Sequence, residues 1–164
     1  MNFWEIITMF GDLKFWIAAS IMNLIVCMNI PRKLRKYLVW FVFLVLPSVV
    51  ISYSITSFLK LIFKVPRPCF SLNGCPQTFS FPSGHATVAF AALTVIALYY
   101  KNKKIALFLL LFACLVSYSR VVLNVHYFED IVAGSFIGIA TAVTVWKTYE
   151  STNFFNRLFT SLKW

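Results

Sequence analysis

The segment that decides the fold runs from Pro82 to Tyr100 and reads PSGHATVAFAALTVIALYY. Beyond His85 it has no ionisable group except two terminal tyrosines, and its length approaches the roughly 20 residues that a helix needs to cross a bilayer. Proline and serine commonly precede or open a helix, as Pro82 and Ser83 do here. We therefore predict a transmembrane helix over Gly84–Tyr100 that begins with polar residues.

Four further apolar stretches flank this segment, and they are Leu13–Ile30, Tyr37–Leu59, Ile105–Val122 and Ile131–Thr148. The whole chain is 60% apolar, 18% aromatic and only 12% charged, with a mean hydropathy of +0.81. These values exceed those of soluble domains. The composition and spacing predict an all-α fold, a polytopic membrane helix bundle with about five transmembrane helices. At 164 residues, we expect one membrane-embedded domain.

Both ends of the chain carry amphipathic patterns outside the predicted spans. The stretch from Asn2 to Phe10 is too short to cross a bilayer, and it places Phe3, Trp4, Ile7 and Phe10 on one helical face. This pattern favours a short interfacial helix over a frayed terminus. The segment from Glu150 to Trp164 has a similar period and predicts a helix lying on the membrane surface.

The net charge of +10 follows the predicted topology and does not indicate a nucleic-acid partner. Ten of the fifteen basic residues lie on one side of a five-span chain: Arg32, Lys33, Arg35, Lys36, Lys101, Lys103, Lys104, Lys147, Arg157 and Lys163. The positive-inside rule makes that side cytoplasmic. With the small size of the chain, this predicts a protein of the bacterial inner membrane whose opposite face meets the periplasm.

Three polar clusters interrupt the apolar chain, and the predicted topology places all of them on the non-cytoplasmic face. They lie at residues 60–68, 82–85 and 119–130, and both histidines of the protein fall within them. Ionisable groups near membrane spans are costly and commonly functional. Segments more than 60 residues apart in sequence are therefore predicted to form one site.

The cations and the helix start in these clusters suit a phosphate group. Arg67 and Arg120 offer planar guanidinium forks, and Lys60 offers a compact charge. The glycine of Ser83-Gly84 lets the backbone approach a ligand, and the first amides of the following helix point toward an anion. The same run is also typical of a simple helix cap.

The histidines and Asp130 supply the groups needed for phosphoryl transfer. His126 and Asp130 are four residues apart, so they share a face on a helical turn. The carboxylate can orient the imidazole and leave its other nitrogen free to attack phosphorus. His85, on another helix, can protonate the departing alkoxide. A structural hydrogen bond or half a metal site is the alternative for the His–Asp pair. We predict no metal and no cofactor, because too few further ligands lie on this face.

In order and spacing, these residues resemble a known family. The motifs are Lys60-(six residues)-Arg67-Pro68, Pro82-Ser83-Gly84-His85 and Ser119-Arg120-(five residues)-His126-(three residues)-Asp130. They resemble the three signatures of the type 2 phosphatidic acid phosphatase superfamily and span somewhat under half the chain. Membrane members of that family often have six spans, whereas five are predicted here.

The resemblance implies a metal-independent lipid phosphatase whose site caps a helix bundle. His126 would be the nucleophile, Asp130 its partner and His85 the general acid. The residues implied around the phosphate are Lys60, Arg67, Ser83, Gly84 and Arg120. The implied partners are a phosphorylated lipid and the bilayer, while the oligomeric state is left open.

The resemblance leaves the lipid undecided. Compact bacterial members that act on lipid A 1-phosphate or phosphatidylglycerophosphate are the most similar, which favours these two substrates. Undecaprenyl pyrophosphate and phosphatidate are alternatives. A lipid phosphotransferase would use the same residues, and an inactive lipid-phosphate-binding protein is the alternative outside enzymes.

Two cysteines lie in the connection between the first two motifs. Cys69 and Cys75 are on the side predicted to face an oxidising compartment, which permits a disulfide there. The bond would stiffen the segment that carries Arg67. Two free thiols are the alternative.

Overall fold

A computed structural model describes residues 2–70 and 74–151 of the chain, and no strand occurs among them. The predicted helix beyond Ser151 therefore lies outside the described residues. The elements in chain order are α1 (Phe3–Thr8), the 3-10 turn η1 (Met9–Gly11), α2 (Leu13–Asn29), α3 (Arg32–Phe63), α4 (Gly84–Tyr100), α5 (Lys103–Val122) and α6 (Phe128–Ser151). The predicted all-α membrane bundle is confirmed.

Length and hydropathy qualify three helical segments as membrane spans on their own: Leu38–Phe63, Lys103–Val122 and Phe128–Ser151. The N-terminal segment Phe3–Gly11 and α2 qualify as a fourth span when taken together, although the chain bends by 67° between them. The helix α4 is equally apolar but has 17 residues, so it is about 26 Å long. The five predicted spans correspond to α2 through α6.

The helix α3 is longer at both ends than the predicted span Tyr37–Leu59. It begins at Arg32 and ends at Phe63, so it includes the basic residues of the first connection. Lysine and arginine are good helix formers, and a helix continues until its backbone is capped, whatever the hydropathy. Here Lys64 caps α3 in the left-handed conformation.

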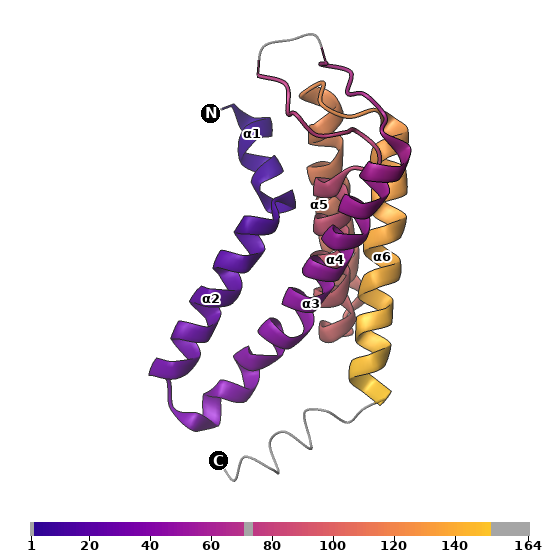
Figure 1. The fold of residues 1–164 in the computed structure, drawn as a ribbon. Coiled ribbons are helices and arrows are strands. Elements are labelled where there is room, and N and C mark those ends of the chain that lie inside the picture. The colour runs from indigo at the N-terminus through magenta and orange to yellow at the C-terminus, as the bar shows by residue number, and fades with distance from the viewer. Residues whose placement is uncertain (1, 71–73, 152–164) are drawn as a thin grey trace.

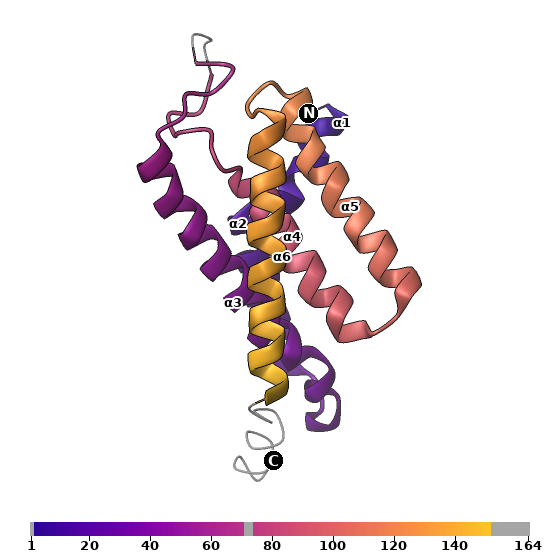
Figure 2. The ribbon, with the colours of Figure 1, turned by 90° about the vertical axis from the view of Figure 1, so that its right-hand side faces the viewer.

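The helix α4 lies at the centre of the bundle, where it packs against α3, α5 and α6 (Figure 2). Most of its side chains are buried, and many of them are small. Two glycines of α6 allow the closest approach. A Cβ atom at Gly134 would lie 2.6 Å from the Ser83 carbonyl oxygen, and one at Gly138 would lie 2.4 Å from that of Thr87. Small residues at such contacts let membrane helices pack backbone to backbone.

The connections that carry the polar motifs gather at one end of the bundle. Figure 1 shows α1, the α3–α4 connection and the α5–α6 connection there, while the turn between α2 and α3 lies at the opposite end. We call the end that holds α1, the α3–α4 connection and the α5–α6 connection the site end. It brings together segments from the N-terminus to residue 130.

Candidate active site

His126 and Asp130 form a buried pair at the site end, where α5 connects to α6. The His126 Nδ1 atom lies 3.0 Å from Asp130 Oδ2, and both side chains are almost fully buried. Burial lowers the pKa of His126 to about 4, although the hydrogen bond to Asp130 opposes this shift. The ring is therefore neutral at pH 7. The carboxylate next to Nδ1 assigns the proton to that nitrogen, which leaves a lone pair on Nε2.

A serine outside the sequence motifs completes this pair. The Ser80 hydroxyl donates to Asp130 Oδ2 and lies 3.3 Å from His126 Nδ1. The backbone N–H of Tyr127 also donates to Asp130 Oδ2, at 3.0 Å. Hydrogen bonds to an ionised carboxylate stabilise its charged form. Ser80 thus helps to keep Asp130 charged and correctly placed beside the imidazole.

We predict that Ser80→Ala lowers kcat for phosphate release by about tenfold, the effect of one lost hydrogen bond to a charged group. Without the hydroxyl, the carboxylate is held less firmly and orients His126 less well. Steady-state phosphate release in detergent measures this change. Ser54→Ala is the matched control, because the exposed Ser54 hydroxyl bonds only its own helix, to the Val50 carbonyl. Equal rates for both variants would contradict the role of Ser80.

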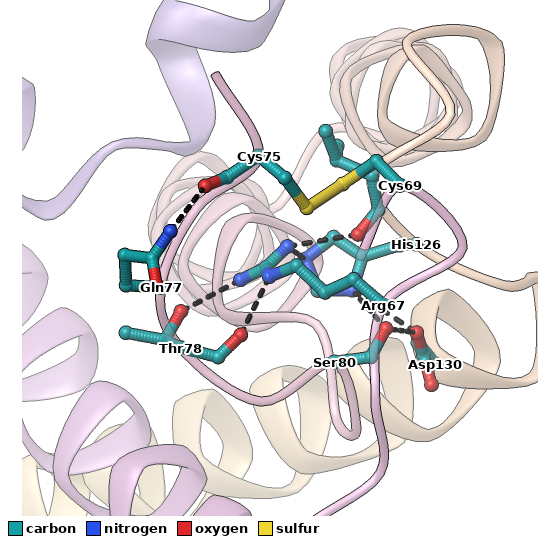
Figure 3. The surroundings of a disulfide bond; sticks show 9 residues. Arg67, Cys69, Cys75, Gln77, Thr78, Ser80, His126 and Asp130 are labelled. Carbon is teal, nitrogen blue, oxygen red and sulfur yellow. Dashed lines mark hydrogen bonds and ion pairs between the residues drawn. A yellow bond between two sulfur atoms is a disulfide. The ribbon is translucent and has the colours of Figure 1, made fainter. Parts of the chain in front are cut away.

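Arg67 connects the histidine to the α3–α4 connection (Figure 3). Its NH1 atom lies 3.0 Å from His126 Nε2 and donates to the Val125 carbonyl at 2.8 Å. Its Nε and NH2 atoms donate to the carbonyl and hydroxyl oxygens of Thr78, at 2.7 and 2.8 Å. Burial lowers the pKa of Arg67, and the negative charge of Asp130 opposes this effect. The guanidinium thus lies directly beside the free imidazole nitrogen.

Lys60 and a disulfide hold the connection that carries Arg67 and Ser80. The Lys60 ammonium, near the end of α3, donates to the carbonyls of Phe79 and Ser80, at 2.6 and 2.8 Å. Cys69 and Cys75 are joined by a disulfide, with their Cα atoms 5.6 Å apart. In this arrangement Lys60 positions the loop, and its predicted contact with phosphate stays a prediction.

Ser83 and Gly84 begin α4 beside the histidine pair. The Ser83 N–H donates to the Asp130 carbonyl at 3.0 Å, and its side chain caps the helix by accepting from the Ala86 N–H at 3.4 Å. The first intrahelical bond runs from the Thr87 N–H to the Ser83 carbonyl. The amides of Gly84 and His85 precede that bond, so they have no acceptor within the helix and can bind an anion.

His85 and Arg120 form a second part of the site, which we call the acid half. His85 lies in the first turn of α4, within electrostatic reach of Arg120 and His126. The Arg120 NH1 atom donates to the Thr8 hydroxyl at 2.8 Å. The Arg120 Nε atom is buried and has no hydrogen-bond partner among the described residues. Arg120 therefore has a guanidinium donor without a partner among the described residues, in the same half of the site as the predicted general acid.

The three sequence motifs do not include the hydroxyl groups that support these residues. Thr78 holds Arg67, Ser80 holds Asp130, and Thr8 holds Arg120. The motif pattern gives no signal for them, because isolated serines and threonines are common in loops. Within the described part of the chain, no three His, Cys, Asp or Glu side chains gather as metal ligands would.

Comparison with known families gives a match over most of the chain. A family model described as the PAP2 superfamily matches residues 41–154. This range contains all three polar clusters and the helices from most of α3 to α6. The N-terminal segment and α2 lie outside it.

Three curated relatives match shorter parts of the chain. Lipid phosphate phosphatase 1 of Arabidopsis thaliana is 36% identical over 83 residues, which are 43% of this chain and 25% of the relative. Lipid A 4'-phosphatase of Bacteroides thetaiotaomicron is 37% identical over 60 residues, which are 37% of this chain and 27% of the relative. Undecaprenyl-diphosphatase of Sulfolobus acidocaldarius is 34% identical over 76 residues, which are 46% of this chain and 36% of the relative. The match thus spans about a quarter to a third of each relative's length.

Two solved structures have a similar fold. One is described as the first transmembrane PAP2 type phosphatidylglycerolphosphate phosphatase from Bacillus subtilis; it has a TM-score of 0.75 at 24% identity, covering 90% of this chain and 75% of that one. The other is LpxE of Aquifex aeolicus, with a TM-score of 0.69 at 25% identity, covering 88% and 84%. Both likenesses extend beyond the motif-bearing helices.

Proposed function

Because this chain belongs to the PAP2 superfamily, we propose that it is a membrane-embedded lipid phosphatase that works through a phosphohistidine intermediate. One observation carries the proposal: the two ring nitrogens of His126 have different partners. Nδ1 faces the Asp130 carboxylate at 3.0 Å, and Nε2 faces the Arg67 guanidinium at 3.0 Å. A neutral imidazole oriented in this way is a nucleophile, with a cation placed where phosphate oxygens would lie.

In the proposed first step, the Nε2 lone pair of His126 attacks phosphorus and the bond from phosphorus to the lipid oxygen breaks. His85 donates a proton to that oxygen as the lipid leaves. Arg67 turns from Nε2 to the phosphate oxygens, and Arg120 offers its unpaired Nε to them. Asp130 stabilises the positive charge that develops on the imidazole.

In the second step, water attacks the phosphohistidine, and the bond between phosphorus and Nε2 breaks. His85, neutral after the first step, accepts a proton from the water and is ready for the next cycle. Inorganic phosphate leaves. A lipid hydroxyl in place of water would give phosphoryl transfer between lipids, so the products distinguish hydrolase from phosphotransferase.

The positive side chains around the phosphate would supply the charge stabilisation that a metal supplies in other phosphatases. We therefore expect purified protein in detergent to release phosphate from lipid phosphates at an unchanged rate in excess chelator. The assay uses protein treated with chelator before the substrate is added. Loss of activity on chelation, restored by a divalent metal, would contradict the metal-independent mechanism.

The proposed substrates are lipid A 1-phosphate and phosphatidylglycerophosphate. The relatives named above carry the names of phosphatases for several lipid phosphates, which supports the substrate class but does not choose within it. A comparison of kcat/KM for these two lipids, phosphatidate and undecaprenyl pyrophosphate ranks them directly. Binding of all four without turnover would instead favour an inactive lipid-phosphate-binding protein.

We also propose that the site end faces the periplasm from the bacterial inner membrane. The basic stretch from Arg32 to Lys36 forms the start of α3, which lies at the end opposite the site (Figure 1). Basic connections favour the cytoplasm, so the site end would lie outside it. The disulfide between Cys69 and Cys75 at the site end agrees with an oxidising compartment.

A further inference from the structure

The N-terminal segment lies against the acid half of the site, although the family match begins only at residue 41. The end of α1 and the turn η1 place residues 8–11 beside α4 and α5. Two contacts in this segment involve residues to which the proposed function gives chemical roles. One reaches Arg120 and the other reaches His85.

The first contact joins Thr8 to Arg120 across 112 residues of sequence. The Thr8 hydroxyl accepts from Arg120 NH1 at 2.8 Å, and both side chains are partly buried. Arginine has a long, flexible stem, so its guanidinium needs fixed partners to present one edge to a ligand. With NH1 held by Thr8, the buried Nε stays without a protein partner in the described residues. The contact therefore fixes one edge of the fork.

The second contact places the backbone of Gly11 directly on His85. A Cβ atom at Gly11 would lie 2.8 Å from the His85 Cβ and 2.9 Å from the His85 carbonyl oxygen. Real Cβ atoms do not approach so closely, so any larger residue would push the first turn of α4 away. Gly11 is buried and belongs to η1, which packs on α4.

The segment is anchored on both sides of these contacts. The Trp16 indole N–H donates to the Phe10 carbonyl at 2.8 Å. The ring of Phe10 packs edge-to-face on Phe112 of α5 at 5.1 Å, and Trp4 packs on Tyr118 at 6.2 Å. Aromatic contacts of this kind stabilise a fixed geometry. Residues 8–11 are thus held against α4 and α5 from both directions.

We propose that residues 8–11 are a working part of the active site. Thr8 is a positioning residue that orients Arg120 toward the phosphate, and Gly11 is a positioning residue that sets the place of His85 relative to the leaving oxygen. This inference rests on the proposed function, since it assigns support to residues of that same site. It extends the site beyond the segment shared with the family.

The first experiment changes the hydroxyl at Thr8. Thr8→Val keeps the shape of the side chain and removes the acceptor. We expect the inhibition constant for inorganic phosphate to rise by about tenfold or more, and kcat/KM for lipid phosphate to fall by a similar factor. Thr8→Ser restores the acceptor and should recover most of the affinity. Thr144→Val is the matched control, because Thr144 is exposed and bonds the Ala140 carbonyl in its own helix.

The second experiment uses the leaving group to separate Gly11 from Thr8. A general acid matters most when the departing oxygen is strongly basic. We expect Gly11→Ala to lower kcat/KM for an alkyl phosphate much more than kcat/KM for p-nitrophenyl phosphate, because kcat/KM reports the step in which the leaving group departs and this phenolate leaves without protonation. Thr8→Val should lower kcat/KM for the two substrates by similar factors, because it weakens phosphate binding. Melting temperatures of all variants in detergent are recorded alongside.

The outcomes separate this inference from the proposed function. An inactive wild-type protein would contradict the proposed function itself. Active wild type with Thr8→Val inhibited as strongly as Thr144→Val would overturn the role of Thr8. An equal loss of kcat/KM for the alkyl and the p-nitrophenyl phosphate in folded Gly11→Ala would overturn the role of Gly11. Failure of Thr8→Ser to recover phosphate affinity would also count against the hydroxyl.

Discussion

His126→Ala is expected to abolish phosphate release from lipid phosphates, by at least about a thousandfold in kcat. The substitution removes the nucleophilic Nε2, which lies 3.0 Å from the Arg67 guanidinium, and leaves no other nitrogen at that position. A second observable is more direct. Wild-type protein quenched during turnover of labelled substrate should carry phosphate that is labile to acid and stable to alkali, as phosphohistidine is, and the variant should carry none.

Folding must be checked in this variant, because His126 is buried and bonded to Asp130. The melting temperature and far-UV circular dichroism in detergent report on the fold, and His126→Gln provides a bulkier replacement if the alanine variant unfolds. A folded variant with wild-type turnover would remove His126 as the nucleophile. Label retained in the variant would show that phosphate is carried elsewhere.

Asp130→Asn is expected to lower kcat by about ten-thousandfold, the size of loss known for changing a carboxylate that orients a catalytic histidine to an amide. Asp130 Oδ2 accepts hydrogen bonds from the Ser80 hydroxyl and the Tyr127 N–H, and it also lies next to His126 Nδ1. An amide keeps the shape, but it removes the negative charge that stabilises the imidazolium and can present N–H to Nδ1. The shift in tautomer would leave Nε2 protonated and unable to attack.

Glu129→Gln is the matched control for this change. Glu129 is exposed and next to Asp130 in the first turn of α6, so it loses the same charge at nearly the same place. We expect its kcat to stay within about threefold of wild type, since exposed charges are screened by water. If the two variants lose activity equally, the effect is one of general charge and the orienting role of Asp130 is wrong.

The sequence predicts the bounds of a helix well where the apolar stretch ends at the same residue as the capped helix. The predicted and observed bounds of Gly84–Tyr100 agree, because Ser83 caps its start and Lys101 adopts the left-handed conformation after its end. They differ most at α3, where charged residues continue the helix beyond the apolar run. The length of an apolar stretch matches the thickness of the bilayer core, whereas the length of a helix depends on where its backbone is capped.

The contact between His126 and Asp130 was predictable from the sequence, whereas the residues that support the motifs were not. His126 and Asp130 meet as their i, i+4 spacing indicates. The contact between Thr8 and Arg120 spans 112 residues, and neither residue has a local pattern that points to the other. The N-terminal pattern predicted a short interfacial helix from its apolar face. Its polar contact with the site depends on how the chain bends by 67° before α2, which periodicity does not encode.

The glycine contacts between α6 and α4 have a consequence for how such proteins diversify. Gly134 and Gly138 bring the two backbones together, and the Ser83 N–H bonds the Asp130 carbonyl across the same seam. Inherited changes along this seam would disturb attack and phosphate binding together, so selection should remove them. Changes at the exposed apolar residues of α2 and α5, such as Met22 and Phe108, leave that geometry intact. New lipid preferences could therefore evolve at the periphery while one reaction is retained at the centre.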